Sequence, residues 1–279
     1  MARCYNKRKI DPLFRRNRVD ENCEETEGKR MSRVGLLGCG KIGSMLLADL
    51  QQSGKHQVTF IQDPFCGEKG EIPVTAAADA ELLAQTDLVI ETATASVLKE
   101  NIAQILEHCD IMLFSVTAFA DDAFLKEVQE LTEKYHHKVY LPHGAILGVD
   151  GIADGRALIT SVEITTTKNP KSLGREDQVR TVVYEGCTRG ACEAYPRNVN
   201  VHATVALAGI GFDKTHSRIV SDPSVSTNTH VIKVEGEGIH FELTISSFST
   251  GGVTGKYTPY SAVASMHKVL DDKEGFRFV

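Results

Sequence analysis

The chain has 279 residues, of which 42% are hydrophobic, so it can bury a sizeable core and is long enough for two domains. Its formal net charge of -6 and pI near 5.9 give no hint of the basic surface that nucleic acid or an acidic membrane would attract. No apolar run reaches the length of a membrane span, so the composition predicts a soluble protein with no membrane or nucleic-acid partner.

The first 31 residues differ in character from the rest. Basic Lys7-Arg8-Lys9 is followed by acidic Asp20-Glu21 with no apolar middle, so neither a secretory signal nor an acid-poor transit peptide fits. We expect residues 1–31 to form a disordered extension. The seven cysteines make no C-x-x-C pair and no metal-ligand cluster, which predicts reduced thiols, no metal site and a cytoplasmic protein.

A glycine-rich turn follows the first apolar run. Val34–Leu37 has the pattern of a buried strand, and three glycines at the spacing G-x-G-x-x-G lead into an amphipathic helix that ends at Ser53-Gly54. In a dinucleotide-binding turn the first glycine permits the bend, the second admits the pyrophosphate and the third lets helix and strand approach. A strand-to-helix turn without a nucleotide is the alternative. The candidate cofactor contacts in this turn are Gly38, Gly40, Lys41, Ile42 and Gly43.

The next strand supports the nucleotide interpretation. Gln57–Gln62 runs into Asp63, about 20 residues after the turn, where this fold places a carboxylate on the adenine ribose. Because a carboxylate would repel a 2′-phosphate, Asp63 favours NAD over NADP as the cofactor. Lys69 on the following loop could reach a 2′-phosphate, so NADP remains an alternative cofactor.

Strands and helices then alternate as far as residue 141. Buried strands are expected over Asp87–Ala93, Asp110–Ser115 and Lys138–Leu141, separated by helices over Ala76–Leu83, Ser96–Leu106 and Ala123–His136. This alternation predicts a parallel sheet covered by helices, and we assign residues 32–143 to a Rossmann dinucleotide-binding domain. Ala93 and Thr94, at the end of the strand expected over Asp87–Ala93, would lie near the nicotinamide.

The second half has a different pattern. Segments with period-two alternation predict strands over Leu158–Thr167, Thr181–Tyr184, Ser217–Val220, His230–Val234 and Ile239–Ile245. With a helix over Asn200–Leu207, they indicate a smaller α+β domain with an open mixed sheet over residues 144–254. A last helix is expected over Tyr260–Leu270 and is long enough to pack back onto the Rossmann domain. We therefore assign residues 255–279 to a C-terminal helical segment that packs on that domain. The fold class is therefore α/β.

Several segments of the second half resemble one family, the L-aspartate dehydrogenases. In chain order they are Pro142-His-Gly-Ala-Ile146 for P-S-G-A-I/L, Thr166-Thr-Lys-Asn-Pro-Lys-Ser-Leu-Gly174 for T-x-K-P-P-x-x-L/F-G, Val183-Tyr-Glu-Gly186 for V-x-F/Y-E-G, Tyr195-Pro-Arg-Asn-Val-Asn-Val201 for F-P-x-N-x-N-V, and Asp222-Pro with Asn228-Thr-His-Val-Ile232 for D-P-x(n)-N-x-H-x-I. Their joint order is far more specific than the glycine turn alone.

The resemblance implies an activity and a set of residues. The activity is NAD(P)-dependent oxidative deamination of L-aspartate to iminoaspartate, which water converts to oxaloacetate and ammonia, or which feeds quinolinate synthesis and so NAD biosynthesis. The resemblance makes His230 the catalytic histidine and Ala145 and Asn200 cofactor contacts. It also implies a homodimer joined through the β-rich domain, whose residues 144–254 carry catalysis and dimerisation.

The chemistry of this reaction agrees with those residue types. Hydride removal from an amine carbon requires a neutral amine, and water addition to the iminium requires proton transfers, so a side chain such as His230 that titrates near neutrality is suited to the work. A surface or structural histidine is the alternative. Lys168 and Lys171 are candidates for binding a dicarboxylate, although solvated loop lysines are the ordinary interpretation, and they stay outside the catalytic set.

Three features depart from the family pattern. His143 stands where Ser is more common, His202 stands where a small residue is common, and Gly255–Tyr260 replaces the family's N-P-K-T-S segment. Both histidines would lie near the nicotinamide. The departures leave open a dehydrogenase acting on another small amino or keto acid, or an NAD(P)-binding protein without turnover.

His136-His137-Lys138 is similar to part of the E-x-H-H-x-x-K motif of dihydrodipicolinate reductases, imine reductases with the same two-domain plan. The lysine that this motif requires is absent, because Tyr140 stands at that position. Basic groups at a helix C-terminus have an ordinary explanation in the helix dipole, which we favour.

Overall fold

The computed structural model describes residues 31–248 and 255–271. The predicted extension over residues 1–31 therefore lies, except for Met31, outside the described residues. In the part of the chain that is described, no helix is both long enough and apolar enough to cross a membrane.

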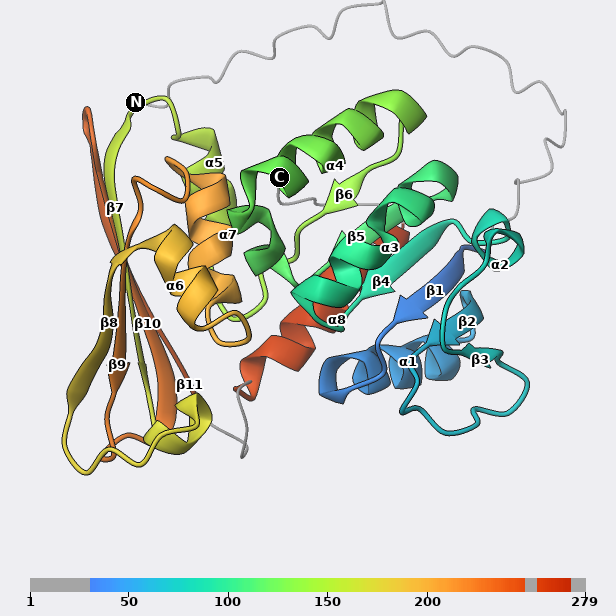
Figure 1. Ribbon diagram of the computed structural model, residues 1–279, viewed down its shortest axis with the longest axis horizontal. Helices are drawn as coiled ribbons and strands as arrows, with labels where there is room; N and C mark the ends of the chain where they lie inside the picture. Colours follow the sequence, from blue (N-terminus) through green and yellow to red (C-terminus); the bar gives the residue numbers. More distant parts are fainter. Residues whose placement is uncertain (1–30, 249–254, 272–279) are drawn as a thin grey trace, which may run out of the picture. The chain divides into compact units, whose positions relative to one another are not determined.

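The first half of the chain forms a six-stranded parallel sheet (Figure 1). Its strands are β1 (Arg33–Leu37), β2 (Gln57–Gln62), β3 (Val74–Thr75), β4 (Leu88–Glu91), β5 (Asp110–Leu113) and β6 (Val139–Tyr140). The order β3-β2-β1-β4-β5-β6 reverses direction beside β1, which is the strand order of a dinucleotide-binding sheet. The predicted Rossmann architecture is confirmed.

Helices cover both faces of this sheet, which explains its continuous apolar strands. The helices are α1 (Lys41–Ser53), α2 (Ala80–Ala84), α3 (Ala95–His108), α4 (Asp122–Tyr135) and α8 (Tyr257–Leu270). Val89 on β4 packs in the cluster with α2, α3 and α4, whereas its neighbours Leu88 and Ile90 pack in the cluster with α1 and α8. Successive side chains of one strand thus enter two separate cores.

The last helix comes from the far end of the described chain. Ala262 and Met266 of α8 are buried with Leu46 and Leu50 of α1. This packing places the start of α8, including Thr258, against the pocket described below.

The second half forms a five-stranded sheet. Its strands are β7 (Ile159–Lys168), β8 (Thr181–Cys187), β9 (His216–Ser221), β10 (Thr227–Gly236) and β11 (Ile239–Phe248), in the order β11-β10-β7-β9-β8. Strands β7 and β9 are parallel and the other neighbours antiparallel, so the predicted open mixed sheet is confirmed. Three helices cover one face of it (Figure 1): α5 (Val149–Asp154), α6 (Thr188–Ala194) and α7 (Asn200–Ala208).

Several local predictions differ from the structure. The helix expected from Ala76 begins only at Ala80, because the carboxylate of Asp79 accepts the N–H of Leu82 at 2.9 Å and so caps the helix there. Helix α6 and two short 3₁₀ helices, η1 (Val116–Ala120) and η2 (Pro170–Leu173), were not predicted. All three elements are too short to show a helical period in the sequence.

Candidate active site

A groove runs along the carboxyl ends of β1 and β4. It is lined by Gly40, Lys41, Ile42, Thr92, Ala93, Thr94, Ala95, Ser96, Phe114, Ser115, Pro196, Arg197 and Asn200. The N-terminus of α1 opens onto it, and the first N–H groups of a helix attract an anion such as a pyrophosphate. The groove lies where open parallel sheets bind their ligands.

The three glycines of the turn have separate structural roles. Gly38 has φ +93°, and a Cβ there would lie 2.9 Å from the backbone nitrogen of Ala93. A Cβ on Gly43 would lie 2.3 Å from the carbonyl oxygen of Gly38, so only glycine lets α1 start this close to β1. A Cβ on Gly40 would meet no heavy atom within 4 Å, which leaves open space at the helix N-terminus. The turn therefore fits a dinucleotide pyrophosphate.

Asp63 lies at the end of β2, beside this turn. Its carboxylate accepts the backbone N–H of Cys39 at 2.7 Å and that of Phe65 at 2.8 Å. Asp63 thereby joins the glycine turn to the loop after β2. The carboxylate keeps further acceptor capacity for a ribose hydroxyl.

Glu91, which the sequence did not single out as a site residue, is an acid that is fully buried at the end of β4. Its carboxylate accepts the Ser115 hydroxyl and the N–H of Ala93, both at 2.7 Å, and the N–H of Phe114 at 3.1 Å. Burial raises the pKa of Glu91, while these hydrogen bonds oppose the rise. Glu91 thus fixes the ends of β4 and β5 that line the groove. The sequence did contain a signal for this buried acid, because Glu91 directly follows the apolar run Leu-Val-Ile of a predicted buried strand.

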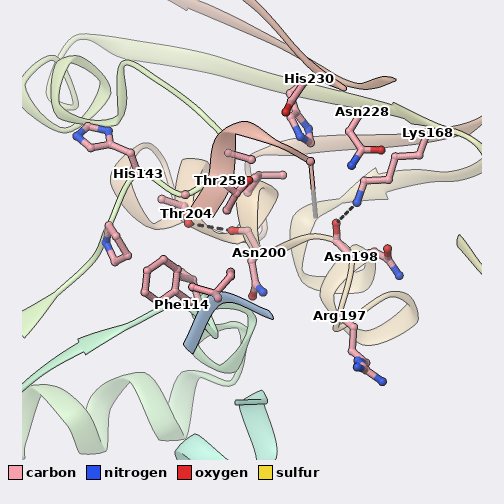
Figure 2. Close-up of a pocket in the computed structure, with 18 residues that line it drawn as sticks. Phe114, His143, Lys168, Arg197, Asn198, Asn200, Thr204, Asn228, His230 and Thr258 are labelled. Carbon is pink, nitrogen blue, oxygen red and sulfur yellow. Dashed lines mark hydrogen bonds between the residues drawn. The ribbon is translucent and has the colours of Figure 1, made fainter. Parts of the chain in front are cut away.

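A pocket adjoins the groove and shares residues with it. Its lining is Ile42, Phe114, Val116, Pro142, His143, Gly144, Ala145, Lys168, Arg197, Asn198, Asn200, Val201, Thr204, Asn228, His230, Ser247, Gly255 and Thr258. Ile42, Phe114, Arg197 and Asn200 line both cavities. In Figure 2, Lys168, Asn228 and His230 project into the pocket from the second sheet, and Phe114 lies on the opposite side.

His230 lies on β10, where alternate residues point into the covered face of the sheet. It is 3% exposed and stands opposite Thr166 of β7 in the strand register. Its Nδ1 lies 2.8 Å from the Thr166 hydroxyl, so Nε2 is the ring nitrogen left to the pocket. Burial, assisted by the charge of Lys168, lowers the pKa of His230 to about 3. The imidazole is therefore neutral at pH 7, and the expectation that it titrates near neutrality is wrong for the protein without substrate.

Lys168 is the last residue of β7 and is buried in the pocket wall. Its ammonium donates to the carbonyl oxygen of Asn198 at 3.2 Å, and no ion pair involves it within residues 31–248 and 255–271 (Figure 2). Burial lowers its pKa to about 8. The interpretation of Lys168 as a solvated loop lysine is wrong, because it continues the buried series of Val162, Ile164 and Thr166. Lys171, on η2, is exposed.

Asn200 links the two halves of the site. It begins α7, and its side-chain oxygen accepts the backbone N–H of Thr117 in η1 at 3.1 Å. This contact leaves the amide N–H₂ of Asn200 for the junction of groove and pocket. Helix α7 also presents Val201 and Thr204 to the pocket.

The two unusual histidines have different positions. His143 lines the pocket, and its Nδ1 is buried with no hydrogen-bond partner among the described residues. His202 lines neither the pocket nor the groove. It follows Asn200 by two residues, which is more than half a helical turn, and so it points toward the sheet.

The structure gathers most of the predicted site residues. Gly40, Lys41, Ala93 and Thr94 line the groove, Ala145 and His230 line the pocket, Ile42 and Asn200 line both, and Gly38, Gly43 and Asp63 form the turn beside them.

The paired histidines of the reductase-like motif lie elsewhere. His136 ends α4 in the left-handed conformation, and His137 Nδ1 lies 3.2 Å from a carboxylate oxygen of Asp110. Neither lines the groove or the pocket.

The described residues contain neither a cluster of metal ligands nor a disulfide. No group of three or more His, Cys, Asp or Glu side chains in them could hold a metal ion. The five cysteines that they contain are free thiols.

Two known families match successive parts of the chain, one over most of the first sheet and the other over the second sheet and α8. Residues 38–142 match the family described as the NAD-binding domain of homoserine dehydrogenase. Residues 150–269 match the family described as the C-terminal region of aspartate dehydrogenase.

Curated relatives cover most of the chain. An L-aspartate dehydrogenase of Methanosarcina mazei is 32% identical over 266 residues, which include 86% of this chain and 98% of the relative. An L-aspartate dehydrogenase of Methanopyrus kandleri is 30% identical over 262 residues, which include 87% of this chain and 97% of the relative.

Solved structures agree. The crystal structure of aspartate dehydrogenase from Thermotoga maritima superposes with a TM-score of 0.76 at 27% identity, covering 89% of this chain and 100% of that one. A homoserine dehydrogenase from Thiobacillus denitrificans, at 12% identity and a TM-score of 0.55, shares the fold alone.

Proposed function

This chain belongs to the L-aspartate dehydrogenase family, and we propose that it oxidises L-aspartate where the groove meets the pocket, with NAD or NADP as the hydride acceptor. The observation that carries the proposal is the pair of Lys168 and His230. Both are buried in the wall of one pocket, and the pocket opens into a groove that fits a dinucleotide.

The groove residues hold the cofactor in this proposal. The α1 N-terminus and Gly40 receive the pyrophosphate, Asp63 the adenine ribose, and Ala93, Thr94, Ala145 and Asn200 the nicotinamide end. When bound, the nicotinamide supplies the carbon that accepts a hydride. The acidic Asp63 favours NAD, as its carboxylate would repel the phosphate of NADP.

Lys168 binds a carboxylate of the substrate. An ammonium that is buried and lacks a charged partner in the described residues gains most from a bound anion. The carboxylate in turn raises the pKa of Lys168 toward its ordinary value and raises that of His230 as well. Substrate binding therefore makes His230 a stronger base than it is in the protein alone.

His230 moves the protons of the reaction. The substrate amine loses a proton before Cα gives up its hydride, and Nε2 of neutral His230 accepts that proton. The C–H bond of Cα breaks and a C=N bond forms, which yields iminoaspartate. Water then adds to the imine carbon with proton transfer through the same nitrogen, and ammonia leaves to give oxaloacetate.

The test is a substrate panel. Purified protein is mixed with NAD⁺ or NADP⁺ and with L-aspartate, L-glutamate, L-alanine or L-homoserine at alkaline pH, and the reduced cofactor is followed by absorbance. We expect turnover with L-aspartate, a lower KM for NAD⁺ than for NADP⁺, and oxaloacetate in equal amount to the reduced cofactor. Turnover only with another amino or keto acid would show that L-aspartate is not the substrate. If no compound in the panel is turned over although the cofactor binds, the protein is an NAD(P)-binding protein without catalytic activity.

The remaining assignments extend the same proposal. We propose that residues 32–143 bind the cofactor and that residues 144–254 carry catalysis and dimerisation. We place the homodimer contact on the uncovered face of the second sheet, where Thr244 and Ser246 of β11 are exposed beside charged residues such as Glu242. Light scattering in solution tests the dimer. A cytoplasmic location and a supply of iminoaspartate for NAD biosynthesis complete the proposal.

A further inference from the structure

A continuous chain of buried hydrogen bonds runs from His230 away from the pocket. None of its members is more than 3% exposed. In order from the pocket they are His230, Thr166, His202, Ser217, Thr188 and the backbone carbonyl of Thr215. Only His230 lines the pocket, so we call the other side chains, Thr166, His202, Ser217 and Thr188, the relay.

The far end of the relay sets the direction of its hydrogen bonds. The Thr215 carbonyl can only accept, and it takes the Thr188 hydroxyl at 3.1 Å. A hydroxyl has one proton, so the Thr188 oxygen must accept from Ser217, which lies 2.7 Å away. Ser217 has then used its own proton, and its oxygen must accept from Nδ1 of His202 at 2.9 Å.

The direction passes through His202 to His230. Burial lowers the pKa of His202 well below its usual value, so the ring is neutral and carries one proton, on Nδ1. Its Nε2 accepts the Thr166 hydroxyl at 2.7 Å. The Thr166 oxygen is left as an acceptor, 2.8 Å from His230 Nδ1, which must therefore carry the proton. Nε2 of His230 is then bare and faces the pocket.

The opposite direction is weaker. If every proton in the relay were reversed, the side-chain bonds would survive, but Thr188 would donate to Ser217 and no longer to the Thr215 carbonyl. His230 would then present an N–H to the pocket instead of a lone pair. The side-chain hydrogen bonds alone would allow either direction of the protons. The additional hydrogen bond to the Thr215 carbonyl favours the direction that leaves Nε2 of His230 without a proton.

The same direction also suits His230 after it has taken up a proton. Imidazolium carries protons on both nitrogens, so Nδ1 still donates to Thr166. No hydroxyl or ring in the relay has to turn during the proton transfer. A network that is already arranged for the charged form stabilises it without reorganisation.

We propose that Thr166, His202, Ser217 and Thr188 are positioning residues that hold His230 in the Nδ1-protonated tautomer and so keep Nε2 available as the base. This inference rests on the proposed function for the catalytic use of Nε2, but the tautomer itself can be measured without turnover.

Thr188→Val tests the relay at the member farthest from the pocket. Without the Thr188 hydroxyl, Ser217 loses its acceptor and gives its proton to His202 Nδ1, which reverses the relay. His230 should then carry its proton on Nε2. Thr188→Ser keeps the hydroxyl and loses only the methyl group, so it is the control for lost packing. Ser217→Ala removes the next hydroxyl. Ser221→Ala on the same strand is its control, since the Ser221 hydroxyl makes no hydrogen bond to a relay residue among the described residues.

The main readout is nitrogen NMR of histidine-labelled protein, in which the two ring nitrogens report which one is protonated. We expect an Nδ1–H signal for His230 in the wild type, Thr188→Ser and Ser221→Ala, and an Nε2–H signal in Thr188→Val and Ser217→Ala. With L-aspartate, kcat should fall about 10-fold or more in the two reversed variants with both KM values little changed.

Two results would overturn the inference: an unchanged tautomer in both Thr188→Val and Ser217→Ala, or equal kcat losses in Thr188→Val and Thr188→Ser. If the wild type does not oxidise L-aspartate, the proposed function fails, while the NMR result still decides the relay. If either Thr188→Val or Ser217→Ala does not fold, the remaining variant still tests the relay at a different residue.

Discussion

The groove and the pocket adjoin one another but are built in opposite ways. The groove depends on backbone shape: on Gly38 and Gly43, where a Cβ would clash, and on the N-terminus of α1, all within one short stretch of sequence. The pocket depends on side chains from β7, α7 and β10 and from the loop before α5. We therefore expect the groove to be sensitive to added atoms and the pocket to changed chemical groups.

The largest effect is expected from His230→Asn. Asparagine keeps a polar group of smaller size but cannot take up the proton, so kcat should fall by about 10²- to 10⁴-fold. The dissociation constant of NAD⁺, measured by fluorescence titration, should stay within a few-fold, because His230 lines the pocket and not the groove. Near-normal turnover would remove His230 from the mechanism.

Lys168→Met should follow in size and act mainly on the substrate. Loss of a buried charge-assisted hydrogen bond should raise the KM for L-aspartate by about 10- to 100-fold while the KM for NAD⁺ changes little. Lys171→Met, three residues later on an exposed turn, is the matched control and should leave both constants unchanged. Equal effects in the two variants would contradict the assignment.

Two glycine variants separate shape from contact within the groove. Gly43→Ala forces a Cβ against the Gly38 carbonyl and should lower the free energy of unfolding by about 1–3 kcal/mol, seen as a lower midpoint in urea. Gly40→Ala has room in the protein and should leave that midpoint unchanged, but raise the KM for NAD⁺ by about 10-fold. A stability loss in Gly40→Ala would show that its space is not free.

Asp63→Ser should change the preference between NAD⁺ and NADP⁺. Serine removes the charge that repels a 2′-phosphate and can still accept a backbone N–H, so kcat/KM for NADP⁺ should rise relative to NAD⁺ by about 10-fold. The ratio of the two kcat/KM values is the measurement. An unchanged ratio would separate Asp63 from the ribose.

The smallest effect is a pH dependence of substrate binding. The pKa of Lys168 is about 8 in the protein, and a bound carboxylate raises it, so binding requires proton uptake above about pH 8. The KM for L-aspartate should therefore rise with pH above about 8 and level off below it. Lys168→Met should lose this part of the profile and retain the part that belongs to the substrate amine.

The sequence predicted the groove better than the pocket for a physical reason. Gly38, Gly40 and Gly43 form a local motif, whose geometry follows from residues next to one another. His230 was predicted through the family resemblance and not through its surroundings, so its low pKa came only from the structure. Lys168 was assigned to solvent, although its phase with Thr166 along β7 was readable as a buried position.

Other contacts were beyond sequence reasoning because they join distant segments. His202 was expected near the nicotinamide, yet the helical turn after Asn200 directs it to Thr166 and Ser217 on two different strands. The carboxylate of Glu91 accepts the backbone N–H groups of Phe114 and Ser115, which follow β5 and which only the sheet brings to it. Such partners depend on the tertiary fold, which local periodicity does not specify.

The most direct test is a crystal structure with NAD⁺ and a dicarboxylate that has no amine to oxidise, such as succinate. We predict the nicotinamide at the junction lined by Ile42 and Asn200, one carboxylate within hydrogen-bonding distance of Lys168 Nζ, and His230 Nε2 facing the substrate carbon chain. A dicarboxylate bound away from Lys168 and His230, or a nicotinamide directed out of the pocket, would contradict the account.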